Sequence, residues 1–150
     1  MLFRSKRVTG DNSVFAYGDY TPVLLKFSTL RYRLMPYIYS RARDVSAGSG
    51  TIMRPLVMDW REDENVWNIA DQFMFGPYLL VNPVTHAGQE TRSLYLPPGG
   101  WTDFWTGEKW AGGRWVSVAA SIDFIPLFVR DGAILPLGPK VQYEIGRAHV

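Results

Sequence analysis

The chain has 150 residues, which suits a single domain or one small domain with an appendage. Aromatic residues make up 15% of it, which is ample for a core and argues against general disorder. The absence of cysteine excludes disulfides, thiolate nucleophiles and cysteine-ligated metals, and His86 and His149 are too few for a usual zinc site.

The two ends of the chain predict a non-native origin. Residues 1–5 and 144–150 back-translate into nucleotide strings that are reverse complements over their shared length and resemble a sequencing-library adapter. We therefore expect residues 1–5 and 145–150 to be adapter-derived and the chain to be a piece of a longer reading frame. Without Arg4 and Arg147 the chain holds 14 basic and 14 acidic residues, so the formal charge of +2 indicates neither nucleic acid nor an acidic membrane as a partner. We expect no signal sequence and no membrane-spanning segment in this chain.

A loop followed by one long helix is predicted for the first third of the chain. Glycine and polar residues recur through residues 6–20, so this stretch should be a loop, in which Phe15 and Tyr17 could face a ligand or pack beneath it. From Thr21 to about residue 47, apolar residues recur at helical spacing. We expect Thr21 to cap this helix, Pro22 to fit its first turn and Pro36 to kink it. The AGSG run at 47–50 should end it.

Short strands are predicted for the remainder. A helical turn is expected over 66–74, capped by Asn65 or Asn68, and Pro55 favours an edge position for the first strand. Turn signals separate the apolar runs at intervals of about ten residues, which is typical of a sandwich or barrel. The expected strands are 51–60, 78–84, 91–96, 101–105 in a hairpin with 109–110, 114–119, 124–129 and 133–137.

Two groups of side chains could carry chemistry. Glu62, Asp63 and Glu64 could bind a metal or act in acid–base catalysis, but an adjacent acidic run is more typical of a solvated loop. His86, in a glycine-containing turn, is interpreted as a solvated loop residue. Tryptophan rings beside carboxylates could form a sugar-binding surface, or they could fill the core of a small β domain. We favour the core. The rings concerned are those of Trp101, Trp105, Trp110 and Trp115.

Several kinds of site are not indicated by the sequence. The AGSG run lacks the strand-to-helix context and the lysine of a phosphate-binding loop. The serines have no recognisable nucleophile elbow, and the basic residues are dispersed, which argues against a hydrolytic triad and against nucleic acid.

Five motifs occur in an order and spacing that resembles glycoside hydrolase family 31. They extend from about Gly18 to Gly138 and read LRYRLMPYIYSRA, TIMRPLVMDW, DQFMFGPYLLVNPV, YLPPGGWTDFWTGEKWAGG and IPLFVRDGAILPLG. The resemblance implies a mainly β chain with one long α-helix: the last helix of a (β/α)8 barrel followed by the proximal C-terminal β-sandwich domain. Residues 6–50 would be the end of the barrel, with the loop at 6–20 near its active-site face, 51–138 the sandwich and 139–150 a tail.

The resemblance also implies a function for the parent protein. Family members cleave O-glycosyl bonds of α-linked glycosides or oligosaccharides with retention, using one Asp as nucleophile and another as acid/base. Both Asp motifs lie upstream of this chain in the family, and the Arg-x-His-Gly pattern expected after the last barrel strand is not legible in KRVTGD. We therefore assign no catalytic, cofactor-binding or metal-binding residue; Asp11, Asp19 and Asp103 occupy no matching motif.

The chain alone should accordingly be inactive and aggregation-prone, with the remainder of its own barrel as its partner. Two alternatives stay open: a carbohydrate-binding sandwich, or a purely structural sandwich, in which every tryptophan ring would be buried.

Overall fold

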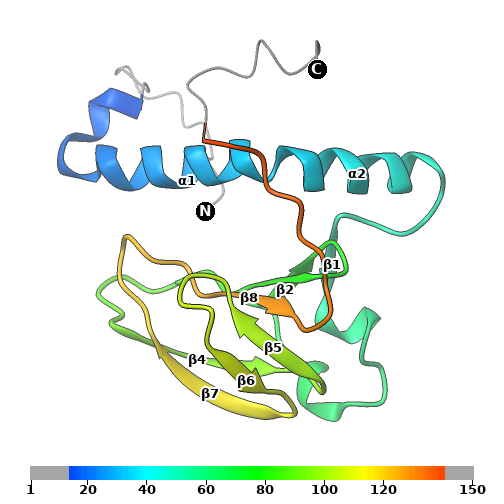
Figure 1. The fold of residues 1–150 in the computed structure, drawn as a ribbon. Coiled ribbons are helices and arrows are strands. Elements are labelled where there is room, and N and C mark those ends of the chain that lie inside the picture. The colour runs from blue at the N-terminus through cyan, green and yellow to red at the C-terminus, as the bar shows by residue number, and fades with distance from the viewer. Residues whose placement is uncertain (1–13, 141–150) are drawn as a thin grey trace. The chain divides into compact units, whose positions relative to one another are not determined.

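The computed structural model describes residues 14–140 (Figure 1). The chain forms two compact units. Among the described residues, one unit comprises 14–40 and 136–140, and the other comprises Arg41–Leu135. The predictions for residues 6–13 and for the adapter-derived ends, with Asp11 and His149, lie outside the described residues. Within residues 14–140, no helix has the length and apolar character needed to cross a membrane.

Helical structure begins earlier than the sequence predicts. Val14–Tyr20 forms a 3-10 helix, η1, which is kinked at Gly18, where φ is +53°. The expectation of a loop is therefore wrong for these residues. The helix α1 (Thr21–Arg33) follows directly, with Pro22 in its first turn as expected. Its N-cap residue is Tyr20 rather than Thr21, and the Tyr20 side chain makes no capping hydrogen bond.

The long helix is interrupted where proline predicts it. Leu34 separates α1 from α2 (Met35–Ser46), and its own N–H still donates to the Leu30 carbonyl at 2.9 Å. Pro36 lies in the first turn of α2 and has no N–H to continue the helical hydrogen bonding, which gives the interruption a physical cause. At the far end Gly48 adopts a φ of +79° and donates to the Val45 carbonyl, as expected of a helix C-terminus.

The second unit contains two antiparallel sheets (Figure 1). The larger sheet has six strands in the order β1 (Met53–Pro55), β2 (Phe73–Phe75), β3 (Leu79–Val81), β8 (Leu127–Arg130), β5 (Gly100–Asp103) and β6 (Lys109–Ala111). The smaller sheet pairs β4 (Thr91–Leu96) with β7 (Arg114–Ala119), so that Tyr95 lies opposite Trp115. The predicted hairpin is confirmed, because Trp101 in β5 pairs with Trp110 in β6.

Some predicted elements are wrong in extent or type. The first strand ends at Pro55, which does occupy an edge of the sheet, and Leu56–Met58 forms a 3-10 helix, η2. The predicted helical turn over 66–74 is replaced by η3 (Glu64–Val66), which Asp63 caps by accepting from the N–H of Asn65, and by β2. Residues 133–137 form no strand, and Ile134 is 83% exposed, so the apolar run does not mark a buried strand here.

Both sheets contribute to one hydrophobic core, which makes the unit a β-sandwich. The core includes Leu94 and Leu96 of β4 and Val116 of β7, together with Met74, Leu80, Trp101 and Phe128 of the larger sheet. Trp101 is fully buried, and its indole N–H donates to the Pro97 carbonyl at 2.8 Å. The prediction of a mainly β chain with helical structure at its start is therefore confirmed.

Candidate functional site

An open cleft with a volume of about 540 Å³ lies at one end of the smaller sheet. Its walls are the loop of residues 59–63, which joins η2 to η3, together with Tyr95, Pro98 and Gly113. Tyr95 belongs to the end of β4, and Gly113 immediately precedes β7. The lining therefore brings together aromatic rings, carboxylates and one guanidinium group.

The loop that forms one wall is fixed by its own contacts. Asp59 accepts a charged hydrogen bond from Arg54, and Asp63 accepts one from the hydroxyl of Tyr95 at 2.6 Å. The second carboxylate oxygen of Asp63 caps η3. The backbone carbonyl of Arg61 accepts from the indole N–H of Trp67 at 2.9 Å. The wall is thus held in place before any ligand arrives.

The hydrogen bond between Tyr95 and Asp63 changes the proton affinity of both groups. It lowers the pKa of Asp63 below its ordinary value, because the hydroxyl donates to the ionised carboxylate. Burial, with the nearby carboxylate, raises the pKa of Tyr95 to about 12. Asp63 therefore stays ionised and Tyr95 stays protonated across the neutral range.

Two charged side chains of the cleft remain available to a ligand. Arg61 and Glu62 are exposed, and neither side chain makes a hydrogen bond or ion pair with another residue in the part of the chain that the structure describes. The ring of Trp115, which is not part of the lining, packs on that of the lining residue Tyr95 with centroids 5.4 Å apart and is 53% exposed. The cleft thus offers a donor and an acceptor, and an exposed ring contacts one of its walls.

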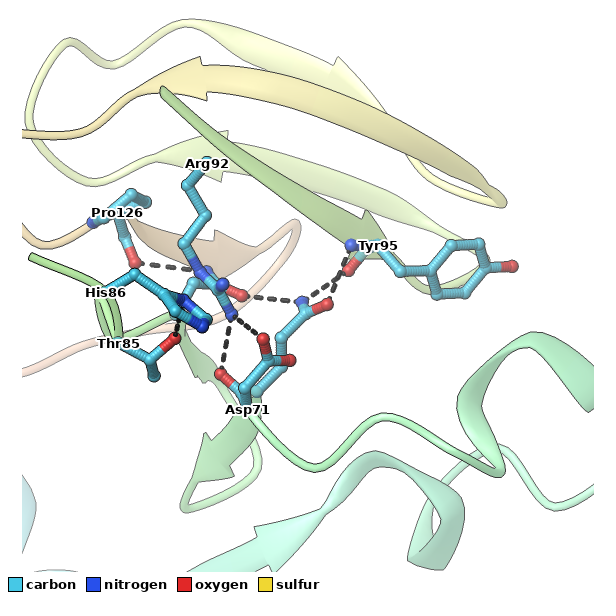
Figure 2. Close-up of polar contacts among 8 residues, drawn as sticks. Asp71, Thr85, His86, Arg92, Tyr95 and Pro126 are labelled. Carbon is cyan, nitrogen blue, oxygen red and sulfur yellow. Dashed lines mark hydrogen bonds and ion pairs between the residues drawn. The ribbon is translucent and has the colours of Figure 1, made fainter. Parts of the chain in front are cut away.

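A buried network of side-chain amides fixes the backbone of Tyr95 on the core side (Figure 2). The Gln72 side chain donates to the Tyr95 carbonyl and accepts from the Tyr95 N–H, both at 2.9 Å, so it takes the place of a neighbouring strand. The same amide donates to Asn82, which in turn donates to the Pro126 carbonyl at 3.1 Å. In Figure 2 the Tyr95 ring points away from this network. The ring position is therefore set by the core.

An ion pair between a buried guanidinium and an exposed carboxylate lies beside this network. Arg92 of β4 is only 4% exposed, and its guanidinium donates both to the Asp71 carboxylate at 2.8 Å and to the Asp71 carbonyl at 2.9 Å (Figure 2). His86, which the sequence places in a solvated turn, is exposed and interacts with the neighbouring Thr85 hydroxyl. The interpretation of His86 as a loop residue is confirmed.

The acidic residues singled out in the sequence have different environments. Glu62 and Glu64 are exposed, as expected of a solvated loop, but Asp63 is half-buried and bonded to Tyr95. Asp103 is buried, and its carboxylate accepts from the N–H groups of Trp105 and Thr106, which is a turn-forming role. Asp19 is exposed in η1, where Tyr17 is 39% exposed.

The four tryptophans proposed from sequence divide between core and surface. Trp101 is in the core as expected, whereas Trp105 and Trp110 are half-buried, with the indole N–H of Trp105 donating to the Ile125 carbonyl. Trp115 and Trp67 are exposed, so the condition of a purely structural sandwich, that every tryptophan ring is buried, is not met. Sequence reasoning missed Tyr95 as part of the cleft, since only the strand register reveals its neighbours.

Comparisons with known proteins identify relatives of the chain along most of its length. Residues 49–135 match the family model described as the glycosyl hydrolase family 31 C-terminal domain. An α-xylosidase of Saccharolobus solfataricus is 53% identical over 120 residues, which is 79% of this chain and 16% of that protein. An isomaltosyltransferase of Sporosarcina globispora is 39% identical over 92% of this chain and 12% of that protein.

Solved structures agree with the sequence comparison. A family 31 dextranase of Flavobacterium johnsoniae, complexed with isomaltotriose, superposes with a TM-score of 0.86 at 34% identity and covers 91% of this chain and 17% of that one. An α-xylosidase of Xanthomonas citri gives 0.80 at 41% identity over 92% of this chain and 15% of that one. The chain thus spans less than a fifth of the length of each of these relatives. It belongs to glycosyl hydrolase family 31, of which it carries the C-terminal domain.

Proposed function

We propose that the chain is the C-terminal portion of a retaining α-glycosidase that hydrolyses α-linked glycosides or oligosaccharides. The observation that carries this proposal is the 53% identity to an α-xylosidase, together with the motif order that extends across both units. Retention requires one carboxylate to attack the anomeric carbon and a second to protonate the departing oxygen. We assign both to the part of the parent protein that precedes this chain.

The role of the chain itself is to complete and support the catalytic barrel. Val23, Leu24, Phe27 and Leu30 recur at helical spacing in α1, yet no residue of that helix is buried. An apolar face of this kind is stabilised when another element covers it, by about 25 cal/mol for each Å² of apolar surface. We infer that α1 and α2 form the last barrel helix, that residues 6–50 end the barrel and that 51–138 form the proximal sandwich.

Glycosyl transfer is a second candidate reaction for the parent. It is favoured by the 39% identity to an isomaltosyltransferase over 92% of the chain. A covalent glycosyl-enzyme intermediate can be released by a sugar hydroxyl in place of water, so the same pair of carboxylates serves both reactions. The role of this chain would be the same in either case.

The proposal is tested by comparing the chain with its complete reading frame. Both proteins are incubated with aryl α-glucosides and aryl α-xylosides, with and without an oligosaccharide acceptor, and the released aryl alcohol and sugar products are measured. We expect the complete protein to cleave at least one substrate and the 150-residue chain to cleave none. Hydrolysis by the chain alone would contradict its supporting role, and a complete protein inert toward every pair would overturn the glycosidase assignment.

A further inference from the structure

The cleft beside Tyr95 has the dimensions of a small-molecule site. Its volume of about 540 Å³ lies within the range of about 300–1,000 Å³ usual for ligand-binding clefts. It is formed by three segments that are distant in sequence: the loop 59–63, the end of β4 with Pro98, and Gly113 just before β7. All three belong to the sandwich unit, so the cleft belongs to this unit alone.

The walls of the cleft are preorganised. The Trp60 ring packs against Trp101 with centroids 6.1 Å apart and lies 5.5 Å from the Arg130 guanidinium. Tyr95 is held by Asp63 on its hydroxyl and by Gln72 on its backbone. A ligand that enters such a site does not have to order these side chains, and this reduces the entropic cost of binding.

The charges of the cleft favour a neutral ligand. The carboxylates of Asp59, Glu62 and Asp63 are largely balanced by the guanidinium of Arg61 in the lining and by that of Arg54, which pairs with Asp59, so the cleft carries little net charge. Two of the three carboxylates are already engaged, Asp59 by Arg54 and Asp63 by Tyr95, so Glu62 alone remains, too few ligands for a divalent cation. Adjacent donor and acceptor side chains suit a molecule that carries neighbouring hydroxyl groups.

The exposed aromatic surface narrows the class of ligand further. Trp115 packs on the lining residue Tyr95, lies two positions after the lining residue Gly113, and leaves about half of its surface to solvent. A pyranose ring has an apolar C–H face that can lie on an indole while its hydroxyls reach polar groups at the side. Polar groups and a flat ring therefore occur together in the arrangement that a sugar needs.

We propose that this cleft, which lies wholly within the sandwich unit, is a carbohydrate-binding site for a short neutral oligosaccharide. Glu62 accepts from sugar hydroxyls, Arg61 donates to sugar oxygens, and Trp115 contacts the C–H face. The site needs no catalytic step, so its occupancy is independent of whether the parent enzyme hydrolyses or transfers sugars. In the parent it would hold a substrate chain by a second point of attachment.

Because the isolated chain is expected to aggregate, its monomeric fraction is first isolated by size-exclusion chromatography. Binding of isomaltotriose, the probe, is then measured by ligand-observed saturation-transfer NMR and by calorimetry. We expect saturable binding that weakens about tenfold in Glu62→Gln, since glutamine keeps an acceptor oxygen but loses the charge that strengthens its hydrogen bond. Trp115→Ala should weaken it to a similar degree, and Trp115→Phe should restore most of it because a ring remains. Circular dichroism shows whether each variant is folded.

Glu90→Gln is the matched control for Glu62→Gln. Glu90 is an exposed carboxylate just before β4, at the opposite end of the strand from Tyr95. Five residues of extended chain separate them, a span of about 16 Å. Binding should be unchanged in this variant. Absence of binding at millimolar isomaltotriose, or equal affinity in wild type, Glu62→Gln and Trp115→Ala, would overturn the proposal and leave the glycosidase assignment untouched.

Discussion

Replacement of Gln72 by leucine should destabilise the sandwich strongly, because it removes three buried hydrogen bonds at once. Gln72 is 3% exposed, and its amide makes three hydrogen bonds, two to the backbone of Tyr95 and one to Asn82. Leucine fills a similar volume but leaves the Tyr95 N–H, the Tyr95 carbonyl and the Asn82 side-chain oxygen without this partner.

The expected loss follows from the cost of unsatisfied buried polar groups. Each such group costs about 1–3 kcal/mol, and the three are neighbours, so their costs do not simply add. We expect the free energy of unfolding to fall by about 3–5 kcal/mol, which is a large part of the stability of a typical domain. Urea unfolding followed by tryptophan fluorescence measures this change, and a thermal midpoint lowered by about 12–20 °C should accompany it, at about 4 °C for each kcal/mol.

Gln89 provides the matched control. Its side-chain oxygen is buried without a hydrogen-bond partner among the residues that the structure describes, so Gln89→Leu removes an unsatisfied group instead of creating one. This variant should be neutral or slightly more stable than the wild type. If Gln72→Leu lost less than about 1 kcal/mol, or no more than Gln89→Leu, the argument that the amide replaces a strand would be refuted.

Three further changes test other parts of the sandwich. Trp101→Ala should cost about 3–5 kcal/mol in urea unfolding, because a fully buried ring leaves a cavity. Gly112→Ala should prevent native folding or shift the turn, visible as lost amide dispersion by NMR, because its Cβ would lie 1.9 Å from the Pro97 carbonyl oxygen. Tyr95→Phe should reduce the pH dependence of stability. In the wild type, the raised pKa of Tyr95 contributes stability below pH 10, and this contribution is lost as the pH rises toward about 12. The lowered pKa of Asp63 contributes stability that is lost as the pH falls below about 4. Unfolding measured from pH 3 to 12 should therefore show a smaller dependence at both extremes in Tyr95→Phe, and equal profiles would contradict the assignment.

The strands that the sequence predicts accurately are those bounded by turn residues close to them in the chain. Residues 91–96 and 114–119 were predicted with the bounds that the structure has, since turn signals flank each of them. The interruption before Pro36 was also predictable, because the missing N–H acts within one helical turn. Such features depend on residues a few positions apart.

The cleft was not predictable because its contacts join distant residues. Asp63 and Tyr95 are separated by 32 positions, and nothing in the acidic run at 62–64 indicates which carboxylate a tyrosine will approach. Arg92 illustrates the same limit: it lies in β4 on the buried face with Leu94 and Leu96, and only the position of Asp71 makes that burial tolerable. Both contacts, Asp63 with Tyr95 and Arg92 with Asp71, therefore depend on tertiary structure and not on the local sequence.

The geometry of the cleft is coupled to the core through Tyr95. Gln72 fixes the backbone of this residue, while Asp63 fixes its hydroxyl, so the ring bridges the buried network and the open wall. A change on the core side should therefore alter the cleft as well as the stability, whereas a change at Glu62 should alter the cleft alone. This asymmetry follows from the hydrogen bonds, because Glu62 is exposed and its side chain makes none with the other described residues. It allows ligand binding and folding to be separated by experiment within one domain.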